Sequence, residues 1–200
     1  MPDSPYILVV EDILSVRDLL RVQLEVRGYR VQAVRDGQEA LAAIAHEKPA
    51  AVITDILMPR VDGFALAHTL RADPATAGIP IIFLSATYVS ADDERFALEL
   101  GALRFFPKPI DSDQLFKALA EVLQQPPPPE LKMGTREFYM NYRHRLKSKL
   151  AQKDQQIARL ARQAASTPDV YQSALDEAEQ QRAEIQKELD SLAILLNAEA

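Results

Sequence analysis

The sequence predicts an α/β domain, a doubly wound parallel sheet, followed by a separate α-helical segment. Over residues 1–124, short apolar runs alternate with amphipathic stretches, whereas β-branched runs and glycines almost vanish beyond them. Between the two parts stand four consecutive prolines, Pro126 to Pro129, which neither a helix nor a central strand tolerates. We therefore expect a domain at 1–124, a proline-rich linker at 125–130 and a two-helix segment at 131–200.

Five apolar runs mark the expected strands. They are residues 6–10, 29–34, 51–54, 79–84 and 103–106. The first, third and fourth runs are almost continuously apolar, which is typical of strands buried on both faces of a parallel sheet. With helices between them, they form a (βα)₅ pattern, and right-handed crossovers then place helices on both faces of the sheet.

Helix-opening signals stand between these runs. Each pairs a capping residue with an acid or amide three positions later: Ser15 with Asp18, Asp36 with Glu39, Ser90 with Asp93, and Asp111 with Gln114. The first helix is expected to bury one face and to end before Gly28; that face carries Val16, Leu19, Leu20 and Leu24. A further helix is expected over residues 63–71, because Asp73-Pro74 follows.

Composition narrows the possible functions. The chain has 200 residues, a net charge of −6 and no Cys. Without cysteine there is neither a disulfide framework nor a thiolate site, which fits a reducing compartment, so we expect a cytoplasmic protein. Its apolar stretches are shorter than the roughly 18 residues of a membrane span, and the N-terminus lacks a signal-peptide pattern. We expect no membrane partner.

Polar side chains follow four of the five expected strands. Glu11 and Asp12 come after the first strand, Asp55 after the third, and Ser85 after the fourth. Lys108 stands between two prolines after the fifth strand. Because the carboxyl ends of parallel strands meet at one edge of the sheet, these side chains are expected to converge where such sheets bind ligands.

This set of side chains favours a metal and phosphate site. Each residue alone could be a helix cap, a turn residue or a surface lysine, but three clustered carboxylates repel one another. Mg²⁺ relieves that repulsion with oxygen ligands, and a lysine with a hydroxyl would complete a site for a tetrahedral dianion. The glycine motifs of nucleotide-binding folds are absent after the first strand. After the second strand, Asp36 is expected to serve only as a helix cap.

With these residues in this order, residues 5–124 resemble the CheY-like receiver domain of two-component response regulators. The resemblance implies strand order 2-1-3-4-5, Mg²⁺ as cofactor, and phosphoryl transfer to Asp55 from a sensor histidine kinase or phosphotransfer protein. It implies no enzyme activity beyond slow self-catalysed phosphorylation and dephosphorylation. The implied roles are metal binding by Glu11, Asp12, Asp55 and the Leu57 backbone carbonyl, phosphate binding by Lys108, switching by Ser85 and Phe105, and a cis bond before Pro109. Phe105 could instead be a plain core aromatic.

The segment at 131–200 is expected to form two helices, broken at Ser166-Thr167-Pro168-Asp169. Apolar residues recur in steps of 4 and 3, with Lys153 and Arg182 as polar interruptions. The expected seam positions are Leu146, Leu150, Lys153, Ile157, Leu160 and Ala164, then Tyr171, Leu175, Ala178, Arg182, Ile185, Leu189, Leu192 and Leu196. Residues 131–165 hold 9 basic and 2 acidic side chains, and residues 166–200 hold 2 and 8. This predicts an antiparallel hairpin, two copies of which form a four-helix bundle in a homodimer.

Other uses of the helical segment remain open. The helices could fold onto their own α/β domain. The stretch from His144 to Ser148 is similar to the phosphohistidine region of phosphotransfer domains, although Ser stands where that pattern has Gly. Basic side chains at 143, 145, 147 and 149 could also bind nucleic-acid phosphates in a regulator. The segment has no recognition-helix pattern and is nearly neutral overall, so dimerisation is favoured over nucleic-acid binding.

Overall fold

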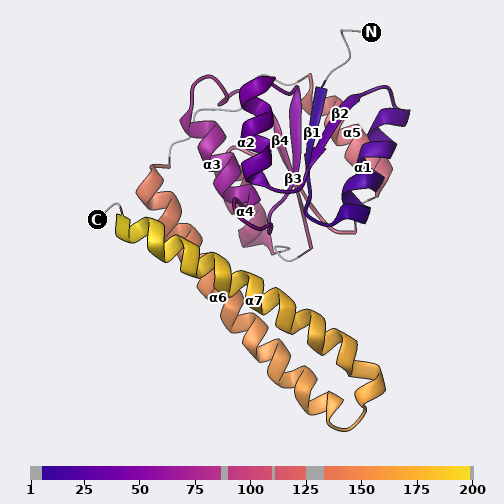
Figure 1. The fold of residues 1–200 in the computed structure, drawn as a ribbon, viewed down its shortest axis with the longest axis vertical. Helices are drawn as coiled ribbons and strands as arrows, with labels where there is room; N and C mark the ends of the chain where they lie inside the picture. Colours follow the sequence, from indigo (N-terminus) through magenta and orange to yellow (C-terminus); the bar gives the residue numbers. More distant parts are fainter. Residues whose placement is uncertain (1–5, 87–89, 110, 125–132, 199–200) are drawn as a thin grey trace. The chain divides into compact units, whose positions relative to one another are not determined.

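The computed structural model describes residues 6–86, 90–109, 111–124 and 133–198. The chain divides into two compact units, Met1–Met133 and Gly134–Ala200 (Figure 1). The proline run that is expected to form a linker lies outside the described residues. Within the described ranges, no helix is both long and apolar enough for a membrane span.

The first unit contains one sheet of five parallel strands in the order β2-β1-β3-β4-β5, which confirms the expected order. Its strands are β1 (Tyr6–Val10), β2 (Arg30–Val34), β3 (Ala51–Asp55), β4 (Ile81–Ser85) and β5 (Arg104–Pro107). Every residue of β1, β3 and β4 is buried, as their continuous apolar sequence indicates.

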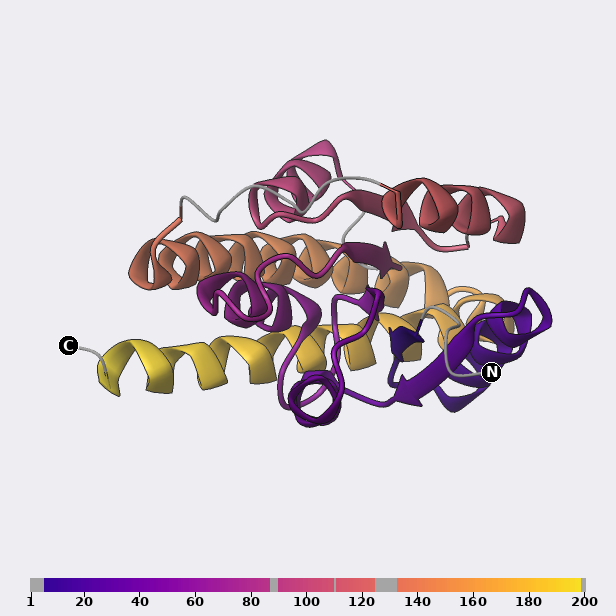
Figure 2. The same cartoon turned by 90° about the horizontal axis from the view of Figure 1, so that it is seen from above.

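Five helices alternate with the strands and cover both faces of the sheet (Figures 1 and 2). They are α1 (Leu14–Val26), α2 (Gly37–His46), α3 (Gly63–Ala72), α4 (Ala91–Glu99) and α5 (Ser112–Val122). On one face, apolar residues of α1 and α5 pack against β1, β3 and β4. On the other, Phe64 of α3 makes edge contacts with Phe83 of β4 and Phe96 of α4.

Most of the expected helix caps are present, and one is wrong. The side chains of Asp36, Ser90 and Asp111 accept backbone N–H groups at the starts of α2, α4 and α5. Ser15 does not cap α1, because the N-cap is Ile13, two residues earlier, and it makes no side-chain cap hydrogen bond. Leu19, expected on the buried face of α1, is 56% exposed.

The second unit is a hairpin of two long helices, α6 (Thr135–Ala164) and α7 (Pro168–Ala198), which lie side by side (Figures 1 and 2). The break between them falls at the expected position. Expected seam residues are buried along both helices: Leu146, Leu160, Ala164, Ala178, Ile185, Leu189 and Leu192. The side chain of Leu196, the last expected seam residue, lies outside the described residues.

Candidate functional site

The carboxyl ends of four strands, β1, β3, β4 and β5, bring the expected site residues to one edge of the sheet. The strand register pairs Val10 with Thr54, Asp55 with Leu84, and Ser85 with Pro107. The residues that follow β1, end β3 and β4, and follow β5 therefore occupy neighbouring positions. This is the carboxyl edge of the sheet, where open α/β folds bind their ligands.

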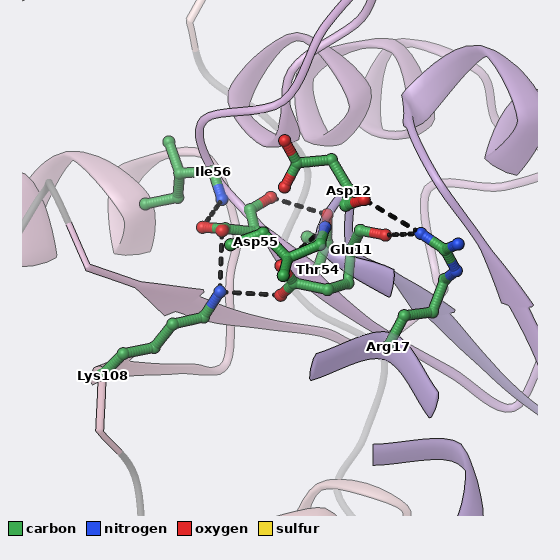
Figure 3. Close-up of polar contacts among 8 residues, drawn as sticks. Glu11, Asp12, Arg17, Thr54, Asp55, Ile56 and Lys108 are labelled. Carbon is green, nitrogen blue, oxygen red and sulfur yellow. Dashed lines mark hydrogen bonds and ion pairs between the residues drawn. The ribbon is translucent and has the colours of Figure 1, made fainter. Parts of the chain in front are cut away.

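Lys108 is the centre of this cluster. Its Nζ donates to Oε2 of Glu11 and to Oδ2 of Asp55, at 2.7 Å in each case (Figure 3). Glu11 is 1% exposed and the Lys108 side chain 16%, so both ion pairs are mostly shielded from water. The Lys108–Pro109 peptide bond is cis, the isomer that the resemblance implied.

Three carboxylates could hold a metal ion at this edge. Glu11, Asp12 and Asp55 each offer an oxygen, and these oxygens lie within 4.8 Å of one another. Glu11 and Asp55 are buried, whereas Asp12 is exposed. A set made only of carboxylate oxygens suits a hard divalent cation such as Mg²⁺ rather than a thiophilic metal. Leu57 lies in the loop two residues beyond Asp55.

The ionisation of the buried groups reflects their crowding. Burial raises the pKa of Glu11, nearby Asp55 raises it further, and Lys108 only partly opposes these effects. Burial likewise raises the pKa of Asp55 against the lowering effect of Lys108. Burial alone would lower the pKa of Lys108, but its two carboxylate partners outweigh burial and raise it. One ammonium group thus compensates two buried carboxylates incompletely, and a further cation would stabilise the cluster.

The backbone holds the carboxylate of Asp55 in a defined orientation. Its Oδ1 accepts the N–H of Ile56 at 2.6 Å, while Oδ2 faces Lys108 (Figure 3). The start of α3 packs against this backbone, and Gly63 donates its N–H to the carbonyl of Ile56 at 2.7 Å. A Cβ on Gly63 would overlap the carbonyl oxygen of Asp55, so a glycine is needed there.

Arg17 supports the acidic pair and was missed by sequence reasoning. Its Nη1 donates to the backbone carbonyls of Glu11, at 2.7 Å, and Asp12, at 3.1 Å (Figure 3). These bonds tie the first turn of α1 to the loop that carries both acids. An arginine five residues after an acidic pair was visible in the sequence, but its contacts are with carbonyl groups, which residue types do not reveal.

The expectation that the loop after β2 contributes only a helix cap is wrong. Asp36 caps α2 and also forms an ion pair with Arg60, in the loop after β3. Gly37 donates to the carbonyl of Val61 at 2.9 Å, and a Cβ on Gly37 would lie 2.6 Å from that oxygen. The loop after β2 therefore contacts and stabilises the loop that follows Asp55 at the end of β3.

The two expected switch residues lie on β4 and β5. Ser85 ends β4 and is fully buried, and its carbonyl accepts the backbone N–H of Lys108 at 2.7 Å. Phe105 is half-buried in β5, opposite Phe83 in the strand register. On α6, His144 is exposed, and the similarity of its surroundings to a phosphotransfer domain stays a hypothesis.

Comparisons with known proteins agree with this fold. A family model for the response regulator receiver domain matches residues 7–120. Response regulator MprA of Mycobacterium sp. strain KMS is 38% identical over 125 residues, covering 62% of this chain and 53% of that protein. Response regulator PleD of Caulobacter vibrioides strain NA1000 / CB15N is 39% identical over 113 residues, covering 56% of this chain and 25% of that protein. The chain thus spans about half or less of the length of these curated relatives.

Solved structures show the same likeness over the first unit. The signal receiver domain of a signal transduction histidine kinase from Syntrophus aciditrophicus is 34% identical with a TM-score of 0.56, covering 60% of this chain and 90% of that chain. Chemotaxis response regulator CheY4 of Vibrio cholerae is 29% identical with a TM-score of 0.56, covering 60% of this chain and 99% of that chain. By the family match, the sheet order and these likenesses, the chain belongs to the response regulator receiver domain family of two-component signalling.

Proposed function

We propose that this chain is a cytoplasmic phosphorylation switch in which Asp55 accepts a phosphoryl group from a phosphohistidine of a sensor histidine kinase or phosphotransfer protein. The observation that carries the proposal is Lys108 Nζ, which lies 2.7 Å from carboxylate oxygens of both Glu11 and Asp55. A buried ammonium group at that point has the charge and position to bind a phosphoryl oxygen once Asp55 carries an acyl phosphate.

In this transfer a carboxylate oxygen of Asp55 forms a bond to phosphorus as the bond from phosphorus to the histidine nitrogen breaks. The leaving imidazole takes up a proton. Mg²⁺, held by Glu11, Asp12 and Asp55 with the Leu57 carbonyl, would neutralise phosphoryl charge. The chain's own part is to orient Asp55 through the N–H of Ile56 and to present Lys108. Beyond slow self-phosphorylation and self-dephosphorylation, we infer no enzyme activity.

The switch uses residues of β4 and β5. A phosphoryl group on Asp55 offers new acceptor oxygens to the hydroxyl of Ser85, which draws in the loop after β4. Phe105 then turns towards the interior. The surface formed by α4, β5 and α5 changes as a result, and it is the region where we expect the signal to be read.

Phosphodonor labelling tests the choice of acceptor. Wild-type protein incubated with acetyl phosphate and Mg²⁺ should gain one phosphoryl group by intact mass, and Asp55→Asn should gain none. Asp62→Asn is the matched control, because Asp62 is also a buried carboxylate but caps α3 by accepting the N–H of Ala65, a role that asparagine fills well. Labelling that survives Asp55→Asn would identify another acceptor.

For the output, we propose homodimerisation or partner binding through the α6–α7 hairpin. The hairpin lies outside residues 7–120, which the receiver family matches, and two helices alone leave seam residues partly exposed to solvent. Light scattering with and without beryllofluoride, which mimics the phosphoryl group, should show a dimer whose affinity differs between the two conditions. A monomer under both conditions at high protein concentration would rule out this output.

A further inference from the structure

The two sides of the α6–α7 hairpin differ in how well their apolar residues are covered. Four seam residues stay only half-buried: Leu150, Ile157, Tyr171 and Leu175. At 100° per residue, Leu150 and Ile157 lie on the same flank of α6, and Tyr171 and Leu175 lie one turn apart on α7. Asp154 lies between Leu150 and Ile157 in sequence, and Arg182 is about two turns beyond Leu175, so the ion pair between Arg182 and Asp154 shows that both flanks face the same side. We call these four residues the open face.

The opposite side of the hairpin is closed by polar contacts. Lys153 Nζ donates to Gln156 on its own helix and to Gln181 on α7, at 2.8 Å in each case. On the open face, Arg182 donates to Asp154 in an ion pair of 2.6 Å, at a level between Leu150 and Ile157. A single polar layer within an apolar seam is a common way to fix the register of packed helices.

The two helices carry opposite charge. Helix α6 has 8 basic and 2 acidic residues, and α7 has 2 basic and 7 acidic residues. Several acids of α7 accept hydrogen bonds from neutral glutamines of the same helix: Gln172 to Asp176, Gln180 to Glu184, Gln181 to Glu177 and Gln186 to Asp190. A glutamine partner leaves the negative charge in place, so α7 keeps its acidic field beside the basic α6.

Two hairpins can stack open face to open face in two symmetric ways. If the two-fold axis runs across the helices, α6 lies on α6 of the other copy and α7 on α7, which brings like charges together. If the axis runs parallel to the helices, α6 of each copy lies against α7 of the other, and both α6–α7 turns are at the same end. Only the second arrangement is complementary in charge.

We propose that the open face docks a second copy of this chain in the second arrangement, with α6 of each chain against α7 of its partner. This inference rests on the dimerisation part of the proposed function and deepens it by specifying the face and the pairing of helices. Asp154 and Arg182 lie at the same height along the hairpin, because they form an ion pair. Lys147 is about two turns before Asp154, and Asp190 is about two turns after Arg182, so these residues also lie at similar heights. In the second arrangement, Lys147 on the outer edge of the open face of α6 therefore lies beside Asp190 of the second copy. Lys147 is exposed, and Asp190 is exposed on the corresponding edge of α7.

Substitutions on and off the open face test the docking surface. Ile157→Ser should raise the dimer dissociation constant at least about tenfold in sedimentation or light-scattering titrations. Val170→Ser is the control, because Val170 is 65% exposed and lies next to Tyr171 in sequence, but about 100° around α7 from it, away from the open face. If both variants weaken the dimer equally, or if neither weakens it, the assignment of the open face is overturned. Acetyl phosphate labelling should be unchanged in both variants, so failure here is distinguishable from failure of the phosphoacceptor proposal.

Cysteine cross-linking tests the pairing of helices, because the chain has no cysteine of its own. Under mild oxidation, a mixture of Lys147→Cys and Asp190→Cys proteins should give a disulfide-linked dimer containing one chain of each. Each variant alone should link far less. Self-linked dimers as abundant as mixed ones would contradict the pairing of α6 with α7, and an absence of dimers before oxidation would overturn the proposal that a second copy occupies the open face.

Discussion

Replacing Lys108 with methionine should have two opposite effects: the metal-free protein becomes less stable, and its affinity for Mg²⁺ rises. The ammonium group stands 2.7 Å from one oxygen of Glu11 and 2.7 Å from one of Asp55. It is therefore the internal counter-ion of two carboxylates that we propose as metal ligands. A divalent cation at those oxygens has to share the two carboxylates with the ammonium group of Lys108. The ammonium group also repels the cation.

The structure sets the size of both effects. Unit charges about 4 Å apart interact by about 4 kcal/mol at an effective dielectric constant near 20, and removing one partner of a buried pair costs about 3–5 kcal/mol. We expect the lower end, about 3 kcal/mol, because Glu11 and Asp55 can take up protons once the ammonium is gone, as the raised pKa of each indicates. The melting temperature of the metal-free protein should fall by about 10 °C. Affinity for Mg²⁺ should rise at least about tenfold, equivalent to 1.4 kcal/mol.

Because the chain lacks tryptophan, circular dichroism should follow unfolding and isothermal calorimetry should follow Mg²⁺ binding. Lys108→Arg keeps the positive charge and should keep affinity close to wild type, while Lys117→Met removes an exposed lysine from α5 and should change neither quantity. The reasoning is refuted if Lys108→Met binds Mg²⁺ no more tightly than wild type, or if its metal-free form is as stable as wild type.

Two further predictions concern the same cluster. Folding raises the pKa values of Glu11 and Asp55 above their unfolded values of 4.5 and 3.8. The stability that comes from protonating these two groups is fully present below the unfolded pKa values, and it is lost as pH rises through the folded pKa values. Stabilisation by Mg²⁺ should therefore increase in thermal melts as pH rises above the unfolded values, because the two carboxyl groups must lose their protons to bind the metal, and a flat dependence would contradict the raised pKa values. Gly63→Ala should destabilise the protein by at least about 2 kcal/mol in urea titrations, because its Cβ would overlap the carbonyl of Asp55. Gly134→Ala, with no atom near the added Cβ, should change stability by less than about 1 kcal/mol, and equal effects would contradict this packing argument.

The sheet and most of the site could be predicted because both depend on local sequence. A fully buried parallel strand needs a continuous apolar run, and strand ends bring residues such as Asp55 and Lys108 to one edge whatever lies between them. The expected strand bounds lie within two residues of those observed.

The errors arose where local patterns are degenerate or where contacts involve the backbone. Ser15 resembles a cap, but α1 begins earlier with Ile13 at its N-cap, whose N–H donates to the Glu11 carboxylate at 3.3 Å. Leu19 fits an apolar helical period, yet its position on α1 faces solvent. The support of the acidic loop by Arg17 depends on carbonyl groups, which every residue has, so no residue-type pattern could reveal it.

The pairing of Asp36 with Arg60 joins two loops whose proximity follows only from the strand order. Because β2 lies at the edge of the sheet and β3 at its centre, the sequence separation of these residues carries no sign of contact. In the hairpin, the 4-and-3 spacing predicted the seam, but not that its α6 flank at Leu150 and Ile157 would remain open.

The central claim is that Asp55 forms an acyl phosphate, and chemical trapping of that bond tests it most directly. Protein treated with acetyl phosphate and Mg²⁺ is reduced with borohydride, which converts a phosphorylated aspartate into homoserine, and peptide mass spectrometry then locates the change. The account predicts homoserine at position 55 only, dependent on both the phosphodonor and Mg²⁺. Homoserine at position 12 or 62, or a phosphoryl group that resists reduction and hydroxylamine, would contradict it.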